Sequence, residues 1–292
     1  LCIGKRDNAY VLASESCALD TIGAEFIRDV EPGEMVVISP EKGIESHREL
    51  CQKEHGRCVF EYIYFARPDS VIDGMSVYQS RIIAGRCLAK DSPVEADLVV
   101  GVPESGNAAA LGYSLESGIP YGTAFVKNGY VGRTFIKPKQ SQRESSVRVK
   151  LNVLKDAVAG KRVIMIDDSI VRGTQLRETT EYLFESGAKE VHIRPACPPL
   201  VYGCKYLNFS RSNSEMELIT RNVIAELEGG DVSDEVLQEY ADYTSEKYQK
   251  MVDKICEKLK FTSLRFHRLD DMLEAVGIEP EKLCTYCWNG KE

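Results

Sequence analysis

The sequence shows neither a membrane-spanning run nor a visible signal peptide. No apolar run approaches the ~18 residues that a helix needs to cross a bilayer. The opening residues show no succession of basic, apolar and small residues of the kind that forms a signal peptide. We therefore expect a cytoplasmic protein with no membrane partner.

Positive charge is also scarce. The chain carries 37 Lys and Arg against 45 Asp and Glu, which leaves a net charge of −8. This balance provides no bulk attraction to nucleic acid or to an anionic membrane, so we expect neither as a partner. Any anionic ligand must be held by a local site. Hydrophobic residues make up 43% and charged residues 28%, as is typical of a globular protein.

The two common nucleotide-binding loops are missing as well. The sequence contains neither GxxxxGK[ST] nor GxGxxG, which excludes the usual phosphate loop and the dinucleotide fingerprint. The four histidines show no metal-binding spacing and no triad setting. We find no internal repeat and no low-complexity tract.

What is present begins with short strands and turns. The first residue is Leu1 rather than Met, and we expect the natural N-terminus to be missing. Residues 9–13 and 35–38 are strand-like, and a turn at 31–34 precedes the second strand. A polar stretch from 39 to 57 is a candidate domain boundary.

From residue 97 the pattern changes to strand, loop and helix in series. A continuous apolar run at 98–102 is typical of a strand buried on both faces, residues 162–166 repeat the pattern, and 191–193 adds another strand. Loops follow at 103–107 and 167–174. The first leads into a helix at 108–115 and the second into a helix that ends near 186, before Gly187. This pattern predicts an α/β fold with a parallel sheet, and both loops should lie at its carboxyl edge.

Residues 231–260 have a different, amphipathic pattern. Ser233 is a good N-cap, and one helical face collects Tyr248, Met251, Val252, Ile255 and Leu259. We expect one long helix or a pair of helices that covers the domain. A partner-binding helix is the alternative.

The most informative segment is 163–174, where an apolar strand ends in Asp167 and Asp168. The loop and the following helix N-terminus offer unpaired N–H groups to an anion, and Gly173 allows close approach of the backbone. Ser169 and Thr174 add hydroxyl donors. Two acids beside a phosphate cradle make sense if they accept hydrogen bonds from sugar hydroxyls or hold Mg²⁺. The alternative is an ordinary turn with surface acids.

This segment closely resembles the signature of the phosphoribosyltransferases. The resemblance implies a type I phosphoribosyltransferase fold, with Asp167 and Asp168 on the ribose hydroxyls and Mg²⁺. The earlier loop looks like the pyrophosphate loop of that family, and Ser105 there would also contact the metal. The implied substrate-binding residues are Glu104, Ser105, Gly106, Ser169, Ile170, Val171, Arg172, Gly173 and Thr174.

Residues 127–150 are basic and poor in apolar residues. They lie between the two loops in sequence, and a lid over a leaving pyrophosphate would need this composition, because it would stabilise the leaving group and exclude water. Our candidates for the lid contacts are Lys127, Tyr130 and Arg133, of which the two cations would act in catalysis. The alternative is a solvated basic loop.

Longer segments resemble the amidophosphoribosyltransferases. They are CVFEYIYFARPDS at 58–70, GVPESG at 101–106, YVGRTFI at 130–136 and IDDSIVRGT at 166–174. Residues 10–16, 20–25 and 31–37 resemble the end of the glutaminase domain of that family, an N-terminal-nucleophile hydrolase. We therefore divide the chain into a glutaminase remnant at 1–52 and a phosphoribosyltransferase domain at 53–292. The catalytic cysteine of the glutaminase would lie upstream, and Cys2 is not expected to replace it.

The resemblance also implies an activity and partners. The chain would transfer the phosphoribosyl group of phosphoribosyl pyrophosphate to ammonia, which the intact enzyme takes from glutamine. The product would be 5-phosphoribosylamine, in the first step of purine biosynthesis. Purine nucleotides are the implied feedback inhibitors, and a homo-oligomer, a tetramer in relatives, is the implied assembly.

Ten cysteines are many for a cytosolic enzyme, and the one CxxC motif lies at 284–287. Some members of the family hold a [4Fe–4S] cluster, and the matching positions here are Cys58, Cys204, Cys284 and Cys287. Four thiolates also suit zinc, and reduced thiols are a further alternative.

Two other functions are consistent with parts of the pattern. A salvage enzyme that transfers phosphoribose to a base would share the signature, but it would have no glutaminase remnant. A ligand-sensing regulator on the same fold would need a basic DNA-binding segment, which the net charge of −8 does not favour.

Overall fold

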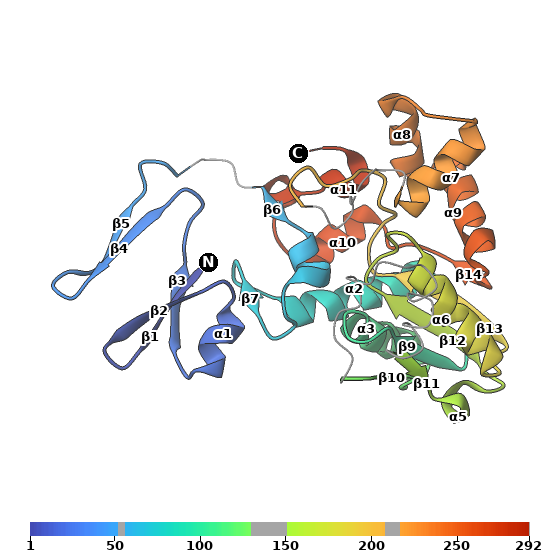
Figure 1. Cartoon of the computed structure of the whole chain (residues 1–292), viewed down its shortest axis with the longest axis horizontal. Helices are drawn as coiled ribbons and strands as arrows, with labels where there is room; N and C mark the ends of the chain where they lie inside the picture. Colours follow the sequence, from blue (N-terminus) through green and yellow to red (C-terminus); the bar gives the residue numbers. More distant parts are fainter. Residues whose placement is uncertain (52–55, 130–150, 208–216, 292) are drawn as a thin grey trace, which may run out of the picture. The chain divides into compact units, whose positions relative to one another are not determined.

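The computed structural model describes residues 1–51, 56–129, 151–207 and 217–291. The chain forms two compact units (Figure 1). The first comprises Leu1–Ser80 and Val276–Cys284, and the second comprises Arg81–Ala275 and Thr285–Glu292. The domain boundary expected between residues 52 and 53 stays a prediction.

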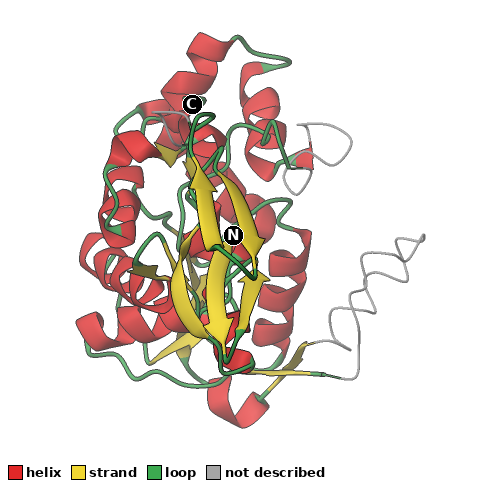
Figure 2. Cartoon of the chain, turned by 90° about the vertical axis from the view of Figure 1, so that its left-hand side faces the viewer, coloured by secondary structure: helices red, strands yellow, loops and turns green. Residues whose placement is uncertain are grey.

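The first unit begins with a small antiparallel sheet in the order β2–β1–β3 (Figure 2). Its elements are β1 (Cys2–Arg6), β2 (Ala9–Ala13), α1 (Ser16–Thr21) and β3 (Glu25–Asp29), and a hairpin of β4 (Met35–Ser39) and β5 (Gly43–His47) follows. Cys2, Leu19 and Ala24 form its core. The predicted strands at 9–13 and 35–38 are therefore present, and Cys2 is the first residue of β1.

The rest of the first unit is tied to this sheet through Glu15. The Glu15 carboxylate accepts hydrogen bonds from the Arg67 amide at 2.9 Å and from the Ser70 hydroxyl at 2.7 Å. Residues 1–29 and 67–71 are thus joined within one unit. Its further elements are β6 (Arg57–Cys58), the π-helix η1 (Glu61–Phe65), β7 (Val71–Ile72), β8 (Met75–Ser76), the 3₁₀-helix η4 (Pro280–Lys282) and β15 (Leu283–Cys284).

The second unit is built on a parallel sheet in the order β14–β13–β12–β9. Its strands are β9 (Leu98–Gly101), β12 (Arg162–Asp167), β13 (Glu190–Pro195) and β14 (Ser263–Leu264). The strands predicted at 98–102, 162–166 and 191–193 form the first three of these strands. Continuous apolar runs suit this sheet because both of its faces are buried.

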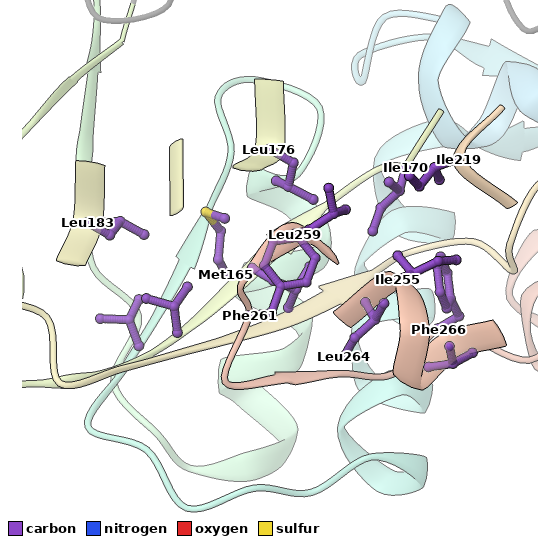
Figure 3. Packing of buried hydrophobic residues seen from close by; sticks show 14 of the residues in the cluster. Met165, Ile170, Leu176, Leu183, Ile219, Ile255, Leu259, Phe261, Leu264 and Phe266 are labelled. Carbon is purple, nitrogen blue, oxygen red and sulfur yellow. The ribbon is translucent and has the colours of Figure 1, made fainter. Parts of the chain in front are cut away.

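Helices cover the two faces of the sheet, and alternate residues of β12 show the two layers. Ile164 and Ile166 pack with Leu88 of α2 (Val77–Asp91) and Tyr113 of α3 (Asn107–Ser117). Val163 and Met165 belong to the core of the opposite face, part of which is drawn in Figure 3. That face carries α6 (Thr174–Glu185), α7 (Ile219–Glu228), α8 (Asp234–Ala241) and α9 (Glu246–Leu259).

The segment 231–260 forms a pair of helices, α8 and α9. Ser233 is the N-cap residue of α8, as predicted, and the Ser245 hydroxyl caps α9 by accepting the Tyr248 amide at 3.0 Å. Of the five residues predicted for one helical face, Met251, Val252, Ile255 and Leu259 are buried. The segment therefore covers the sheet, as expected.

The remaining elements of the second unit are short. They are β10 (Phe125–Lys127), β11 (Leu151–Val153), α5 (Lys155–Val158), α10 (Leu269–Val276, whose last residue belongs to the first unit) and α11 (Tyr286–Asn289). Strands β10 and β11 pair antiparallel. Within the described ranges, no helix has the length and apolar character that a membrane span requires.

Candidate active site

The two predicted loops lie next to each other because their strands are neighbours in the sheet. In β9 and β12, Gly101 pairs with Ile166, and just beyond this pair the Val102 amide donates to the Ile166 carbonyl at 2.8 Å. A Cβ at Gly106 would collide with the same carbonyl oxygen. Glycine at 106 therefore allows the loop 102–106 to approach the end of β12.

Asp168 joins the two loops through its carboxylate. Oδ1 accepts a hydrogen bond from the Ser105 hydroxyl, and Oδ2 accepts one from the Ser169 hydroxyl, both at 2.6 Å. One donor comes from each loop, so the loops converge on a single carboxylate. The predicted residues Ser105, Asp168 and Ser169 are thus brought together.

Asp167 stands beside this group at the end of β12. Its Oδ1 accepts the Asp168 amide at 2.9 Å. Burial, and then the neighbouring Asp168 charge, raise the pKa of Asp167 well above its usual range. A second negative charge here is therefore unfavourable without a partner. A cation, or a ligand that donates hydroxyl hydrogens, would offset it.

The loop 169–173 is anchored to the protein by its middle residues. Ile170 is buried in the core, the Val171 carbonyl accepts the Ile219 amide at 2.8 Å, and Arg172 forms an ion pair with Glu217. Gly173 has a positive φ of 76° and is the N-cap residue of α6. The groups left to face an anion are the Thr174 hydroxyl and the amides at the start of α6, and the Ser169 hydroxyl could join them only by leaving Asp168.

Lys127 also reaches the first loop. Its ammonium group lies 3.3 Å from the Glu104 carboxylate, and the peptide bond between Pro103 and Glu104 is cis. Lys127 is the last residue of β10, whereas the sequence predicted that it lies in a basic loop; the strand extends further because it pairs with β11. The other lid candidates, Tyr130 and Arg133, lie outside the described residues, as does the basic segment 130–150.

Of the four cysteines predicted to hold a cluster, two belong to each unit of the chain. Cys58 and Cys284 are register partners in the parallel pairing of β6 and β15. In the second unit, the Cys287 carbonyl accepts the Val201 and Tyr202 amides at 3.0 Å, close in sequence to Cys204. No disulfide forms among the ten cysteines, all of which are described. The described part of the chain contains no group of three or more His, Cys, Asp or Glu side chains that could hold a metal ion.

The sequence did not predict the residues outside the loop 169–173 that hold it in place. Glu217 and Ile219 lie more than 40 residues after the loop, next to the start of α7. Neither belongs to a motif, and no spacing relates them to Arg172 or Val171. Their role follows only from the tertiary contact.

Comparison with curated proteins finds relatives of one kind. An amidophosphoribosyltransferase of Archaeoglobus fulgidus is 51% identical over 216 residues, which cover 74% of this chain and 47% of the relative. An amidophosphoribosyltransferase of Mycobacterium bovis is 44% identical over 292 residues, which cover all of this chain and 50% of the relative. This chain is a relative of the amidophosphoribosyltransferases. It spans about half the length of these curated relatives. No family model matches the sequence.

A solved structure supports the same relationship. The glutamine phosphoribosylpyrophosphate amidotransferase from B. subtilis, complexed with ADP and GMP, matches with a TM-score of 0.81 and 40% identity. The match covers 99% of this chain and 58% of that structure. The predicted α/β fold class, with its parallel sheet flanked by helices, is confirmed.

Proposed function

We propose that this chain transfers the phosphoribosyl group of phosphoribosyl pyrophosphate to ammonia, giving 5-phosphoribosylamine and pyrophosphate. This is the first step of purine biosynthesis, and glutamine would supply the ammonia in the whole protein. The observation that carries the proposal concerns the Asp168 carboxylate. It accepts a hydrogen bond from the Ser105 hydroxyl of one loop and another from the Ser169 hydroxyl of the other loop. The amidophosphoribosyltransferase relatives support the choice of reaction.

In this proposal the substrate lies along the carboxyl edge of the sheet. The 5-phosphate accepts hydrogen bonds from the amides and hydroxyls of residues Ser169 to Thr174. The ribose hydroxyls donate hydrogen bonds to Asp167 and Asp168. The pyrophosphate lies on the loop with Glu104, Ser105 and Gly106. Positive charge develops on the sugar as the bond from C1 to pyrophosphate breaks, and ammonia attacks C1. Lys127 and Arg133, with Tyr130, would stabilise the departing pyrophosphate and exclude water.

Mg²⁺ is the proposed metal, and the donor set suits it. Mg²⁺ in such sites binds one or two carboxylates and otherwise keeps water and substrate oxygens. Asp167, Asp168 and Ser105 provide two carboxylates and a hydroxyl within one hydrogen-bonded group. When bound, the metal would neutralise charge on the pyrophosphate leaving group. Omitting Mg²⁺ should abolish turnover, and full activity in excess chelator would contradict its role.

The test of the function is pyrophosphate release from phosphoribosyl pyrophosphate with Mg²⁺ and ammonium. We expect release by the full chain and its loss in Asp167→Ala. Adenine, guanine and uracil replace ammonium in parallel reactions, because base-dependent release would indicate a salvage enzyme instead. A folded chain that releases no pyrophosphate with any acceptor would refute the proposed transfer.

A [4Fe–4S] cluster on Cys58, Cys204, Cys284 and Cys287 is the second proposed cofactor. The family resemblance implies the four ligands, and the register pairing of Cys58 with Cys284 is compatible with them. No step of the reaction is assigned to it. Iron and sulfide are measured after purification without oxygen, and we expect both in wild type and neither in Cys58→Ser. Zinc in place of iron would overturn the choice of metal.

Regulation, assembly and location complete the proposal. One matching structure is complexed with ADP and GMP, so we expect purine nucleotides to inhibit this chain as well. Inhibition of pyrophosphate release by both nucleotides is the check.

A homo-oligomer, expected to be a tetramer, is tested by light scattering of the purified chain. The proposed location is the cytoplasm, to be tested by fractionation.

A further inference from the structure

The C-terminal end of α9 packs directly against the phosphate loop. An ideal Cβ placed on Gly173 would lie 2.8 Å and 2.9 Å from the two terminal methyl carbons of Leu259. Such distances mean that the Leu259 side chain already occupies the space beside the Gly173 backbone. Gly173 is also the N-cap residue of α6, so this contact lies where the phosphate-binding amides begin.

A second residue of the loop is buried in the core to which α9 contributes. Ile170 is 3% exposed and belongs to one hydrophobic cluster with Ile255 and Leu259. Figure 3 shows Leu259 among Met165 and Leu176, with Ile170 beside Ile219. Ile170 and Gly173 of the loop therefore both rest on a core that includes residues of α9.

Helix α9 is itself fixed to the two helices that flank the loop. Lys258 donates to Asn222 of α7 at 2.7 Å, and it also forms an ion pair with Glu226 of α7. Lys260, the C-cap residue of α9, lies 2.9 Å from Glu181 of α6. These contacts hold the last turn of α9 in place on both sides. Leu259 therefore contacts the loop from a fixed position.

We infer that Leu259 is a positioning residue for substrate binding, because it sets the place of Gly173 and of the amides that receive the 5-phosphate. The inference rests on the proposed function for its substrate, and it extends that function to the segment 231–260. Removing the Leu259 side chain would let the loop shift into the vacated space. A shift of a fraction of an ångström weakens several hydrogen bonds to one phosphate together.

The test compares Leu259→Ala with Leu183→Ala in the full chain. Both leucines belong to the same hydrophobic cluster, but Leu183 lies about 15 Å along α6 from Gly173. For Leu259→Ala we expect the KM for phosphoribosyl pyrophosphate to rise ~10-fold with kcat changed less than ~3-fold. Leu183→Ala should lower thermal stability comparably and leave KM unchanged. Leu259→Met, which conserves volume, should restore the wild-type KM.

A second readout does not depend on the reaction. Hydrogen exchange of the amides from 169 to 175 should accelerate in Leu259→Ala and not in Leu183→Ala. Equal exchange and equal KM in the two alanine variants would overturn the inference, whereas a wild-type chain without turnover would count only against the proposed function. In a double-mutant cycle, Gly173→Ala should be less harmful when Leu259 is already alanine. Strict additivity in that cycle would also overturn the inference.

Discussion

At the scale of single residues, the site depends on the absence of side chains as much as on their presence. The Val102 amide reaches the Ile166 carbonyl, and Gly106 passes the same carbonyl oxygen with no room for a methyl group. The Ser105 hydroxyl that bonds Asp168 is the neighbour of Gly106. Gly106 therefore determines how closely the first loop approaches the two acids, although glycine has no side chain to contact a ligand.

Gly106→Ala should reduce activity although it adds a single carbon. The new Cβ would push the loop 102–106 away from β12, which breaks the hydrogen bond from Ser105 to Asp168. We expect kcat/KM for phosphoribosyl pyrophosphate to fall at least ~10-fold. Steady-state kinetics of the variant, with its thermal unfolding as a control for folding, would check this. Unchanged kinetics would show that the loop accommodates the methyl group.

At the scale of elements, the helix that carries the first loop is held by a close helix–helix crossing. Gly85 of α2 lies against the Ala109 carbonyl of α3, and Gly112 of α3 lies against the Ile82 carbonyl of α2. In each case a Cβ would collide with backbone of the other helix. Each helix thus presents its glycine to the other, and the two backbones approach without side chains between them.

Gly112→Ala reverses the usual effect of alanine in a helix. In an open position the change would stabilise α3 by ~1 kcal/mol. Here the methyl group meets the Ile82 carbonyl, so we expect a net loss of about 1–3 kcal/mol. Denaturant unfolding measures this value. A gain in stability would mean that α2 and α3 can separate without cost.

The elements that the sequence predicted share a simple physical cause. The strands at 98–102 and 163–166 are apolar on both faces, the strand at 191–193 is apolar on one, and the two loops follow the first two strands directly. Helix α2 was not predicted from the sequence, because Ser80, Arg81 and Gly85 interrupt the apolar residues of its buried face. The packing of Leu259 on Gly173 joins residues 86 positions apart. Periodicity indicated that Leu259 is buried, but it could not identify the partner.

At the scale of the whole molecule, buried titratable groups couple folding to pH. His267 is 1% exposed, and its Nδ1 lies 3.2 Å from the Ala196 carbonyl. Burial lowers the pKa of His267 to about 4 from its ordinary 6.5, while the Ala196 carbonyl and Asp91 act in the opposite direction and Arg268 lowers it further. Between these two pKa values the unfolded chain binds a proton that the folded chain does not. Stability must therefore fall as pH falls through this window.

We expect His267 to contribute about 3 kcal/mol of the stability lost between pH 6.5 and pH 4. His267→Asn removes the titration and keeps an N–H group for the Ala196 carbonyl. Urea unfolding of both proteins at several pH values should give a flatter dependence for the variant over this window. If the stabilities of the two proteins changed in parallel with pH over this window, His267 would be protonated there in the folded protein as it is in the unfolded chain.

The two serine hydroxyls on Asp168 have a consequence for selectivity. The carboxylate already holds two hydroxyls, one on each oxygen. A vicinal diol that binds there can replace both in a one-for-one exchange, so the number of hydrogen bonds to Asp168 stays constant. The displaced serine hydroxyls then become free to bond the incoming molecule. A sugar with a single hydroxyl would replace only one of the two serine hydroxyls. Asp168 would therefore discriminate between sugars by the number of hydroxyls that they offer to its two oxygens.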